Sequence, residues 1–132
     1  MKTTYEQLVQ QINQAFEKGD LEFLAAHLHE DVRWQISGSK PIHGKSAFLK
    51  CCSEAPLKDG STKITVTNIL ADGNNVATEG IIEAETLAGK AYRQAFCDIY
   101  HFEGDLIKTM SSYLDTAYDR EILAGSAIYQ NN

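Results

Sequence analysis

The first part of the chain carries hydrophobic residues at helical spacing. Six of them recur with the i, i+3, i+4, i+7 period of an amphipathic helix: Tyr5, Leu8, Val9, Ile12, Ala15 and Phe16. Thr3 and Glu6 have the spacing of a capping box and predict where this helix begins. Gly19 stands where a left-handed residue ends many helices, and Asp20 can cap a second helix directly afterwards.

The second helix has a shorter apolar face, formed by Leu21, Leu24, Ala25 and Leu28. We expect this helix to end at residues 29–31, where the sequence is His-Glu-Asp. The period then switches to two, because Val32, Trp34 and Ile36 alternate with polar residues. This alternation predicts a short strand with one buried face.

The next segment contains most of the loop-forming residues. Glycine, serine and proline predict a loop at residues 37–44, and residues 45–52 follow as a short helix. A second loop is expected at residues 53–61. The tail at 115–132 can start a terminal helix, for which Asp115 or Thr116 would be the cap.

From Lys63 onward the helical period disappears. Turn signals at residues 71–75, 87–90 and 103–105 divide this part of the chain into four strands. Connections of hairpin length force neighbouring strands to be antiparallel. The sequence therefore predicts a four-strand antiparallel meander, and helices grouped at one end of such a sheet make an α+β fold. A strongly curved sheet covered by the helices would leave a conical cavity between them.

The third strand of the meander carries a carboxyl group within an aromatic stripe. Its inner face combines Tyr92, Phe96, Tyr100 and Phe102 with Asp98. A carboxyl group beside aromatic rings loses hydration, which raises its pKa and lets it donate a hydrogen bond or move a proton near neutral pH. Asp98 is therefore the candidate acid of the chain. The alternative is an ionised Asp98 that is paired with an arginine or with backbone amides for structure only.

Composition excludes several classes of function. The chain has 132 residues, which predicts one domain over 1–132 with a core that needs neither metals nor disulfides. A formal charge of −6 argues against binding to nucleic acid or to an anionic membrane surface. No apolar run has the length of a signal peptide or a membrane span. Cys51, Cys52 and Cys97 form no disulfide framework or metal-ligand spacing, so we expect reduced cysteines in a cytoplasmic protein.

Three stretches resemble a known family over nearly the whole chain: "FEKGDLEFLAAHLHEDVRWQISG", "IHGKSAFL" and "FCDIYHFEGDLIKTMSSYLDT". Together with the order of elements, they resemble the SnoaL-like branch of the nuclear-transport-factor-2-like superfamily, which includes ketosteroid isomerases, polyketide cyclases and limonene epoxide hydrolase. The resemblance implies a cystatin-like roll, in which N-terminal helices pack on a strongly curved, mainly antiparallel sheet around a cone-shaped pocket. It also implies a homodimer formed through the outer face of the sheet.

The resemblance transfers few catalytic residues to this chain. The general base of ketosteroid isomerases would fall near Ile36 and their oxyanion-binding tyrosine near Ile12, so only their second oxyanion donor has a counterpart, which is Asp98. The catalytic Asp-Arg-Asp set of the epoxide hydrolase would fall near these three residues: Gly80, Ile82 and Ser112. SnoaL-type cyclases use an acidic residue, and the carboxylates in matching strands are Asp98 and Asp115.

The remaining candidates are ligand contacts and weaker acid–base groups. The pocket-lining candidates, for which core packing is the alternative role, are Trp34, Phe96, Tyr100, Met110 and Ser112. His43, in a loop that the resemblance places near the mouth of the pocket, is a weaker candidate base, and a solvated bystander is its alternative role. By strict alternation Lys108 shares a face with Met110 and could pair with Asp98 or form an imine, unless it simply reaches solvent. His27 and His29 lie two apart and do not face each other, so we expect no metal site.

The sequence predicts a pocket protein for a small hydrophobic molecule that carries a carbonyl or hydroxyl group. If the protein is an enzyme, proton transfer is the expected chemistry, as in isomerases, cyclases or dehydratases. No cofactor is expected, because the sequence has no glycine-rich phosphate loop. The alternative is a non-catalytic ligand-binding or protein-interaction module of the same fold. His43, Lys108 or Tyr100 within reach of Asp98 across an open cavity would favour the enzyme, whereas a cavity with a single polar group would favour binding alone.

Overall fold

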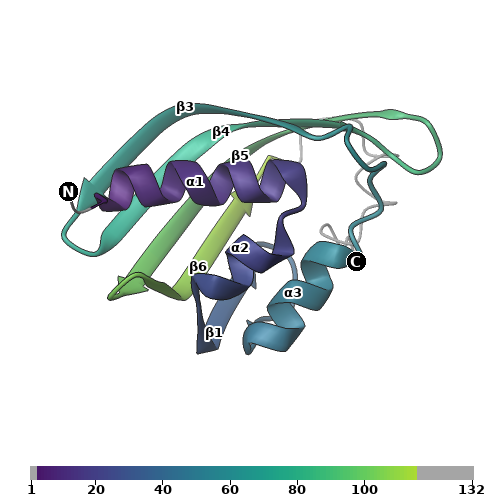
Figure 1. Ribbon diagram of the computed structural model, residues 1–132. Coiled ribbons are helices and arrows are strands. Elements are labelled where there is room, and N and C mark those ends of the chain that lie inside the picture. The colour runs from purple at the N-terminus through teal and green to yellow at the C-terminus, as the bar shows by residue number, and fades with distance from the viewer. Residues whose placement is uncertain (1–2, 116–132) are drawn as a thin grey trace.

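The structure is a computed structural model and describes residues 3–115 (Figure 1). The described part of the chain forms three helices and six strands: α1 (Tyr5–Lys18), α2 (Leu21–Ala26), β1 (Leu28–Ile36), β2 (Ile42–His43), α3 (Lys45–Ser53), β3 (Lys63–Asp72), β4 (Asn75–Glu85), β5 (Ala91–Glu103) and β6 (Leu106–Leu114). The four strands from Lys63 onward and the helix after residue 44 are confirmed. The predicted terminal helix lies outside the described residues.

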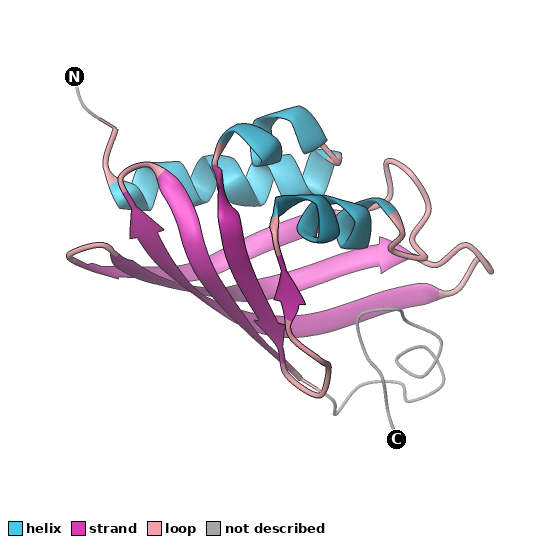
Figure 2. Cartoon of the chain, turned by 90° about the horizontal axis from the view of Figure 1, so that it is seen from below, coloured by secondary structure: helices cyan, strands magenta, loops and turns pink. Residues whose placement is uncertain are grey.

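The six strands form one open sheet in the order β2-β1-β6-β5-β4-β3. All neighbouring strands are antiparallel except β1 and β6, which are parallel. Figure 2 shows that the sheet is strongly curved and that the helices lie together on its concave side. The predicted α+β class, with N-terminal helices on a mainly antiparallel sheet, is confirmed.

The first helix begins one residue later than predicted. The cap is Thr4 instead of Thr3, because the Thr4 hydroxyl accepts a hydrogen bond from the Gln7 backbone N–H at 3.1 Å. The Gln7 side chain accepts one from the Thr4 N–H at 3.0 Å in return. Thr4 and Gln7 have the same capping-box spacing as Thr3 and Glu6, so the sequence pattern fits either register.

The boundary between α1 and α2 follows the prediction, but α2 ends early. Gly19 has φ 68° and ends α1, and the Asp20 carboxylate caps α2 by accepting from the Phe23 N–H at 3.0 Å. The helix then ends at Ala26, and Leu28 lies at the start of β1 instead of on the helix face. A tertiary contact explains the early end of the helix, because Leu28 pairs with a strand that is distant in the sequence.

A β-bulge changes the face on which Lys108 lies. Phe102 pairs with Ile107 and His101 pairs with Thr109, so β6 has one extra residue at this point. Ile107 is fully buried, whereas Lys108 is partly exposed. Strict alternation is therefore wrong here, because the bulge puts Ile107 instead of Lys108 on the inner face.

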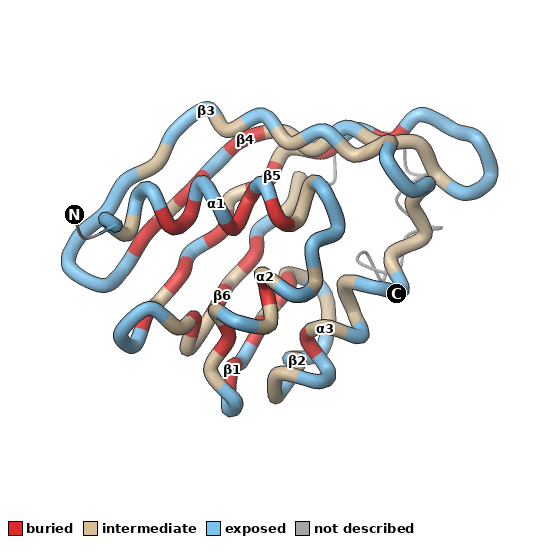
Figure 3. Tube along the Cα trace, in the orientation of Figure 1, coloured by how far each residue is buried: buried red, intermediate tan, exposed pale blue. Residues whose placement is uncertain are grey.

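The core lies between the helices and the concave face of the sheet, as the buried positions in Figure 3 show. Trp34 of β1 stacks on Phe48 of α3 with 4.4 Å between ring centroids. At the other end, Tyr5 of α1 stacks on Phe102 at 4.8 Å, and its hydroxyl donates to the Gly104 carbonyl at 2.7 Å. Burying a side chain of this size stabilises a fold by roughly 1.5–3 kcal/mol. These contacts fix the helices over the sheet.

Gly80 allows β3 to approach β4 closely. It pairs with Val66 on one side and with Phe96 on the other. A Cβ atom at Gly80 would lie 2.1 Å from the Thr65 carbonyl oxygen, which is far inside van der Waals contact. A residue without a Cβ atom is therefore required here by the backbone of the neighbouring strand.

Candidate functional site

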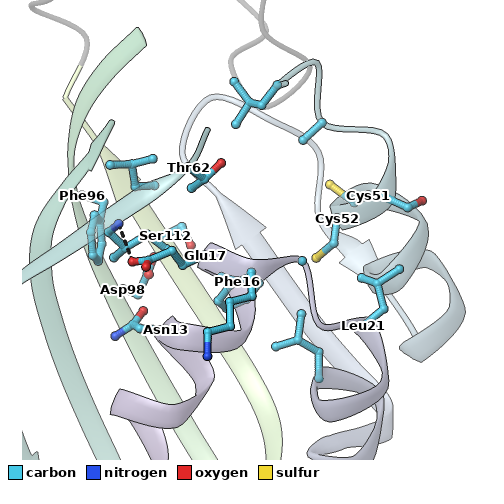
Figure 4. A pocket seen from close by; sticks show the side chains of 18 of the residues that line it. Asn13, Phe16, Glu17, Leu21, Cys51, Cys52, Thr62, Phe96, Asp98 and Ser112 are labelled. Atoms are coloured by element: carbon cyan, nitrogen blue, oxygen red, sulfur yellow. Dashed lines mark hydrogen bonds between the residues drawn. The ribbon is translucent and has the colours of Figure 1, made fainter. Parts of the chain in front are cut away.

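A cavity of about 540 Å³ lies between the helices and the concave face of the sheet. Cavities that bind small molecules typically measure about 300–1,000 Å³. Its polar wall includes Asn13 and Glu17 from α1 together with Asp98 and Ser112 from the sheet, while Leu21, Cys51 and Cys52 line another side (Figure 4). Asp98 thus lies in a polar group at one side of the cavity, and other parts of the lining include Lys18, Lys58 and Asp59.

Asp98 lies on the inner face of β5 with 8% of its surface exposed. Its register partners are Thr78 on β4 and Ser112 on β6, so the three side chains form a polar row across three strands. Burial raises the pKa of Asp98 from its ordinary 3.8 to about 7, and a hydrogen bond from the Ser112 hydroxyl counteracts part of this rise. A pKa near 7 allows the carboxyl group to give or take a proton at neutral pH.

Ser112 connects Asp98 with Trp34. The Trp34 indole N–H donates to the Ser112 oxygen at 2.9 Å. An indole nitrogen can only donate, so the Ser112 oxygen accepts and its own hydrogen is free to point at Asp98. The order of donation is Trp34 to Ser112 to Asp98. The arrangement fixes the rotamer of Ser112 and orients the carboxyl group.

Helix α1 contributes two polar side chains that sequence reasoning missed. Asn13 and Glu17 are four residues apart and therefore lie on the same face of the helix, toward the cavity (Figure 4). The Glu17 carboxylate accepts from the Ile64 backbone N–H at 2.9 Å and holds α1 against β3. The sequence contains one sign of this polar group: Asn13 stands four residues after Val9 and is therefore a polar residue within the apolar stripe of the helix.

Three buried side-chain atoms within residues 3–115 have no hydrogen-bond partner: Asn13 Nδ2, Thr78 Oγ1 and Tyr100 Oη. Buried polar groups are normally paired, so each of these atoms requires an explanation. Asn13 lines the cavity, whereas Thr78 and Tyr100 do not. All three atoms are themselves buried, so none of them faces the open part of the cavity.

Most of the predicted pocket residues come together in the structure. The cavity is lined by Trp34, Phe96, Asp98, Met110 and Ser112. Tyr100 instead lies beneath the cavity wall, where it is fully buried and stacks on Phe102 at 5.9 Å. Burial, together with the charges of Asp98 and Cys52, raises its pKa well above the ordinary value. His43 is exposed on β2 opposite Arg33, and neither it nor Lys108 lines the cavity.

The two adjacent cysteines line the cavity as thiols. Cys51 and Cys52 lie at the end of α3 and are free, as is Cys97 on β5. Burial raises the pKa of Cys52 to about 12, with the neighbouring Cys51 as a smaller cause. Because the thiolate is the nucleophilic form, Cys52 is inert at neutral pH and contributes an apolar contact to the wall.

Within residues 3–115, no group of three histidine, cysteine or acidic side chains is placed to hold a metal ion. His27 Nδ1 lies 2.9 Å from the Phe23 carbonyl oxygen, and His29 Nδ1 accepts from the Asp31 N–H at 3.0 Å. These contacts are local to the end of α2 and the start of β1. None of the helices in this range combines the length and the hydropathy of a membrane span.

A family model described as a SnoaL-like domain matches residues 9–110. The chain belongs to the SnoaL-like family. The match covers the polar side of the cavity except Ser112, which follows the matched range by two residues. No curated protein sequence matches the chain.

Solved structures similar to this SnoaL-like protein belong to proteins of different kinds. An NTF2-like protein of unknown function from Cytophaga hutchinsonii is 28% identical, with a TM-score of 0.68, and the match covers 85% of this chain and 100% of that one. A putative ketosteroid isomerase from Kribbella flavida is 24% identical, with a TM-score of 0.70 and coverage of 85% and 78%. An epoxide hydrolase of the LEH-like type from M. tuberculosis is 18% identical, with a TM-score of 0.73 and coverage of 83% and 77%. At such identities the likeness to the last two shows the fold alone.

Proposed function

We propose that this SnoaL-like protein binds a small hydrophobic carbonyl or hydroxyl compound in the cavity and catalyses proton transfer on it. The observation that carries the proposal is the position of Asp98, which is buried at the polar side of the cavity with a pKa raised to about 7. A carboxyl group in that state can protonate an oxygen atom of the ligand and later take the proton back.

The second group of the proposed reaction is Glu17. It lies on the same polar side of the cavity as Asp98 but comes from α1, and its contact with the Ile64 N–H fixes the position of the carboxylate (Figure 4). For a ketone, Glu17 takes a proton from the α-carbon while Asp98 gives its proton to the carbonyl oxygen. The product is the enol, Asp98 is left as a carboxylate, and Glu17 carries the proton that returns in the reverse step.

The apolar part of the cavity supplies the binding energy of the proposed complex. Phe96, Met110 and Trp34 contribute rings and a thioether beside the carboxyl group, and the side formed by α2 and α3 adds aliphatic and thiol contacts. Burying apolar surface of a ligand is favourable by roughly 25 cal/mol per Å² before the costs of association. This composition supports a ligand that is hydrophobic except for one polar end.

The test is hydrogen exchange at the α-carbon of β-tetralone, a planar hydrophobic ketone, in buffered D2O. We expect the wild-type protein to accelerate the loss of the α-proton signal in NMR spectra, and we expect Asp98→Asn to abolish the acceleration. Asp105→Asn, at an exposed turn, is the matched control and should retain it. Binding of the ketone without any acceleration by the wild type would overturn catalysis and leave a ligand-binding module.

We further propose a cytoplasmic homodimer that associates through the outer face of the sheet. Ile99 and Tyr113 are large hydrophobic residues on that face, with 42% and 54% of their surface exposed. Exposed apolar groups that are contiguous on an antiparallel sheet favour a protein contact. The free cysteines of the described residues support a reducing compartment.

A further inference from the structure

Cys51 and Cys52 place two thiols next to each other on the wall of the cavity. They lie in the last turn of α3, and both line the cavity. Figure 4 shows both sulfur atoms on the cavity side of the helix. Both thiols are free, and the proposed proton transfer uses neither of them. Two neighbouring thiols can bind one ligand together, which a single cysteine cannot do.

The spacing of the pair disfavours its conversion to a disulfide. Adjacent α-carbon atoms across a trans peptide bond are about 3.8 Å apart, whereas ordinary disulfides span about 4.4–6.8 Å between α-carbons. A disulfide between Cys51 and Cys52 would therefore distort the end of α3. Cys97 pairs with Tyr113 on the outer face of the sheet and does not line the cavity. The two thiols of α3 are thus available as a pair.

We propose that Cys51 and Cys52 together bind a trivalent arsenic compound with an apolar substituent, and that the substituent occupies the cavity. One arsenic atom forms a bond to each sulfur atom. The two thiol hydrogens leave with the oxygen of the arsenic compound as one molecule of water. Arsenic stays trivalent, so the step needs neither an oxidant nor a reductant. This binding goes beyond the proposed proton transfer and does not involve Asp98.

The surroundings of the pair favour this ligand over a metal ion. Burial raises the pKa of both thiols, and that of Cys52 rises to about 12. A metal cation would need two thiolates in this wall, and charges in such a place are costly without partners. In the part of the chain that the structure describes, no group of three histidine, cysteine or acidic side chains could complete a metal site. The arsenic product is uncharged and lies beside Leu21 (Figure 4).

Two features of the site select the ligand. After the first bond has formed, the thiol on the next residue meets arsenic at a high effective concentration, so the second bond follows readily. A lone thiol makes only one bond, which an excess of another monothiol displaces. The cavity then selects the substituent, because Phe16 and Leu24 also line it and can bury an apolar group.

The first test is titration with phenylarsine oxide, followed by mass spectrometry of the intact protein. We expect the wild type to gain one phenylarsenic group with the loss of one water. The group should stay bound in excess mercaptoethanol and leave in dimercaptopropanol, which offers two thiols. Cys51→Ser and Cys52→Ser should each bind at least about a hundredfold more weakly, because only one bond to arsenic remains. Cys97→Ser is the matched control and should bind like the wild type.

The second test measures what the cavity adds to the two thiols. Phenylarsine oxide and methylarsenous acid form the same two bonds to sulfur but differ in apolar surface. We expect the native wild type to prefer the phenyl compound by about tenfold or more. The same chain unfolded in urea keeps both thiols but loses the cavity, so the preference should largely disappear. This comparison needs no variant and therefore holds even where a serine variant does not fold.

Three results would overturn the inference. Equal binding by the wild type and the two serine variants of α3, or no binding by the wild type, would mean that the pair does not hold arsenic. Loss of binding in Cys97→Ser would place the site on the outer face of the sheet. An equal preference in the native and the unfolded chain would mean that the cavity takes no part. Because these experiments measure bound arsenic and not α-proton exchange, their failure leaves the proposed function standing, and the reverse also holds.

Discussion

The indole nitrogen of Trp34 donates a hydrogen bond of 2.9 Å to the hydroxyl oxygen of Ser112. The bond joins β1 to β6, the one parallel pair of the sheet, at the wall of the cavity. Ser112 in turn donates to Asp98, so the orientation of the carboxyl group depends on a tryptophan two strands away. The aromatic ring is thus part of the polar site as well as part of the core.

Removing the hydroxyl of Ser112 should change both of its partners. In Ser112→Ala the buried Trp34 N–H loses its acceptor, and we expect a loss of about 1–3 kcal/mol in the free energy of unfolding by urea. Asp98 loses a donor to its charged form, so its pKa should rise further above 7 in ¹³C NMR titration of the carboxyl carbon. Ser111→Ala, on the other face of the same strand, should change neither quantity. An Asp98 pKa that stays the same or falls would contradict the order of donation.

The sheet and its inner face could be predicted because they follow from local patterns. Alternation with a period of two assigns Phe96, Asp98 and Tyr100 to one face of β5, whatever the rest of the chain does. It does not say how far along the strand the cavity extends. Tyr100 shares the face of Asp98 but lies under the helices, outside the cavity. The bulge in β6 likewise depends on pairing with β5, which local spacing does not encode.

The contribution of α1 could not be predicted in the same way. The apolar stripe of this helix shows which face is buried, but it does not show which strand the helix crosses. Glu17 reaches Ile64, a residue 47 positions away in the sequence, and this contact sets Asn13 and Glu17 beside Asp98. The contact is tertiary, so the second carboxyl group of the site became visible only in the structure. His43 is the opposite example: it was a candidate base from its loop position, but it does not line the cavity.

Glu17 can be tested without disturbing its structural contact. In Glu17→Gln the side-chain oxygen still accepts from the Ile64 N–H, so the free energy of unfolding should change by less than about 1 kcal/mol. The amide cannot take a proton, and we expect the rate of β-tetralone exchange at saturation to fall by about a hundredfold, the usual contribution of a general base. Glu22→Gln, which is exposed on α2, is the control. Undiminished exchange in Glu17→Gln would mean that Glu17 only holds α1 against β3 and is not the base.

Dimerisation through the outer face of the sheet should depend on its exposed hydrophobic residues. We expect sedimentation equilibrium at tens of micromolar to give twice the chain mass of 14.7 kDa. Tyr113→Lys places a charge in the proposed contact and should shift the protein to monomers, because burying an unpaired charge is strongly unfavourable. Leu87→Lys, at a more exposed hydrophobic residue in the β4–β5 turn, should leave the dimer intact. A wild-type monomer at this concentration contradicts the proposal.

Asp98 should make the stability of the protein fall as the pH rises from about 4 to about 7. The pKa of Asp98 is about 7 in the folded chain and near the ordinary 3.8 when the chain unfolds. Between these values the native state holds a proton that the unfolded state has released, so the free energy of unfolding decreases with pH. The difference between the two pKa values corresponds to about 4 kcal/mol, which is fully lost above pH 7.

Asp98→Asn separates this effect from the other carboxyl groups of the chain. Asparagine keeps the size of the side chain and an oxygen that accepts from Ser112, but it does not ionise. Urea unfolding from pH 4 to pH 8 should therefore show a flatter dependence in the variant than in the wild type, with the variant relatively more stable at the alkaline end. Asp105→Asn, at an exposed position, should keep the wild-type slope. If Asp98 were ionised and paired, the Asn variant would instead lose stability at pH 8, because a depressed pKa stabilises the fold above it. Whether the Asn variant is more or less stable than the wild type at pH 8 thus decides whether Asp98 is a buried acid of raised pKa or only a structural anion.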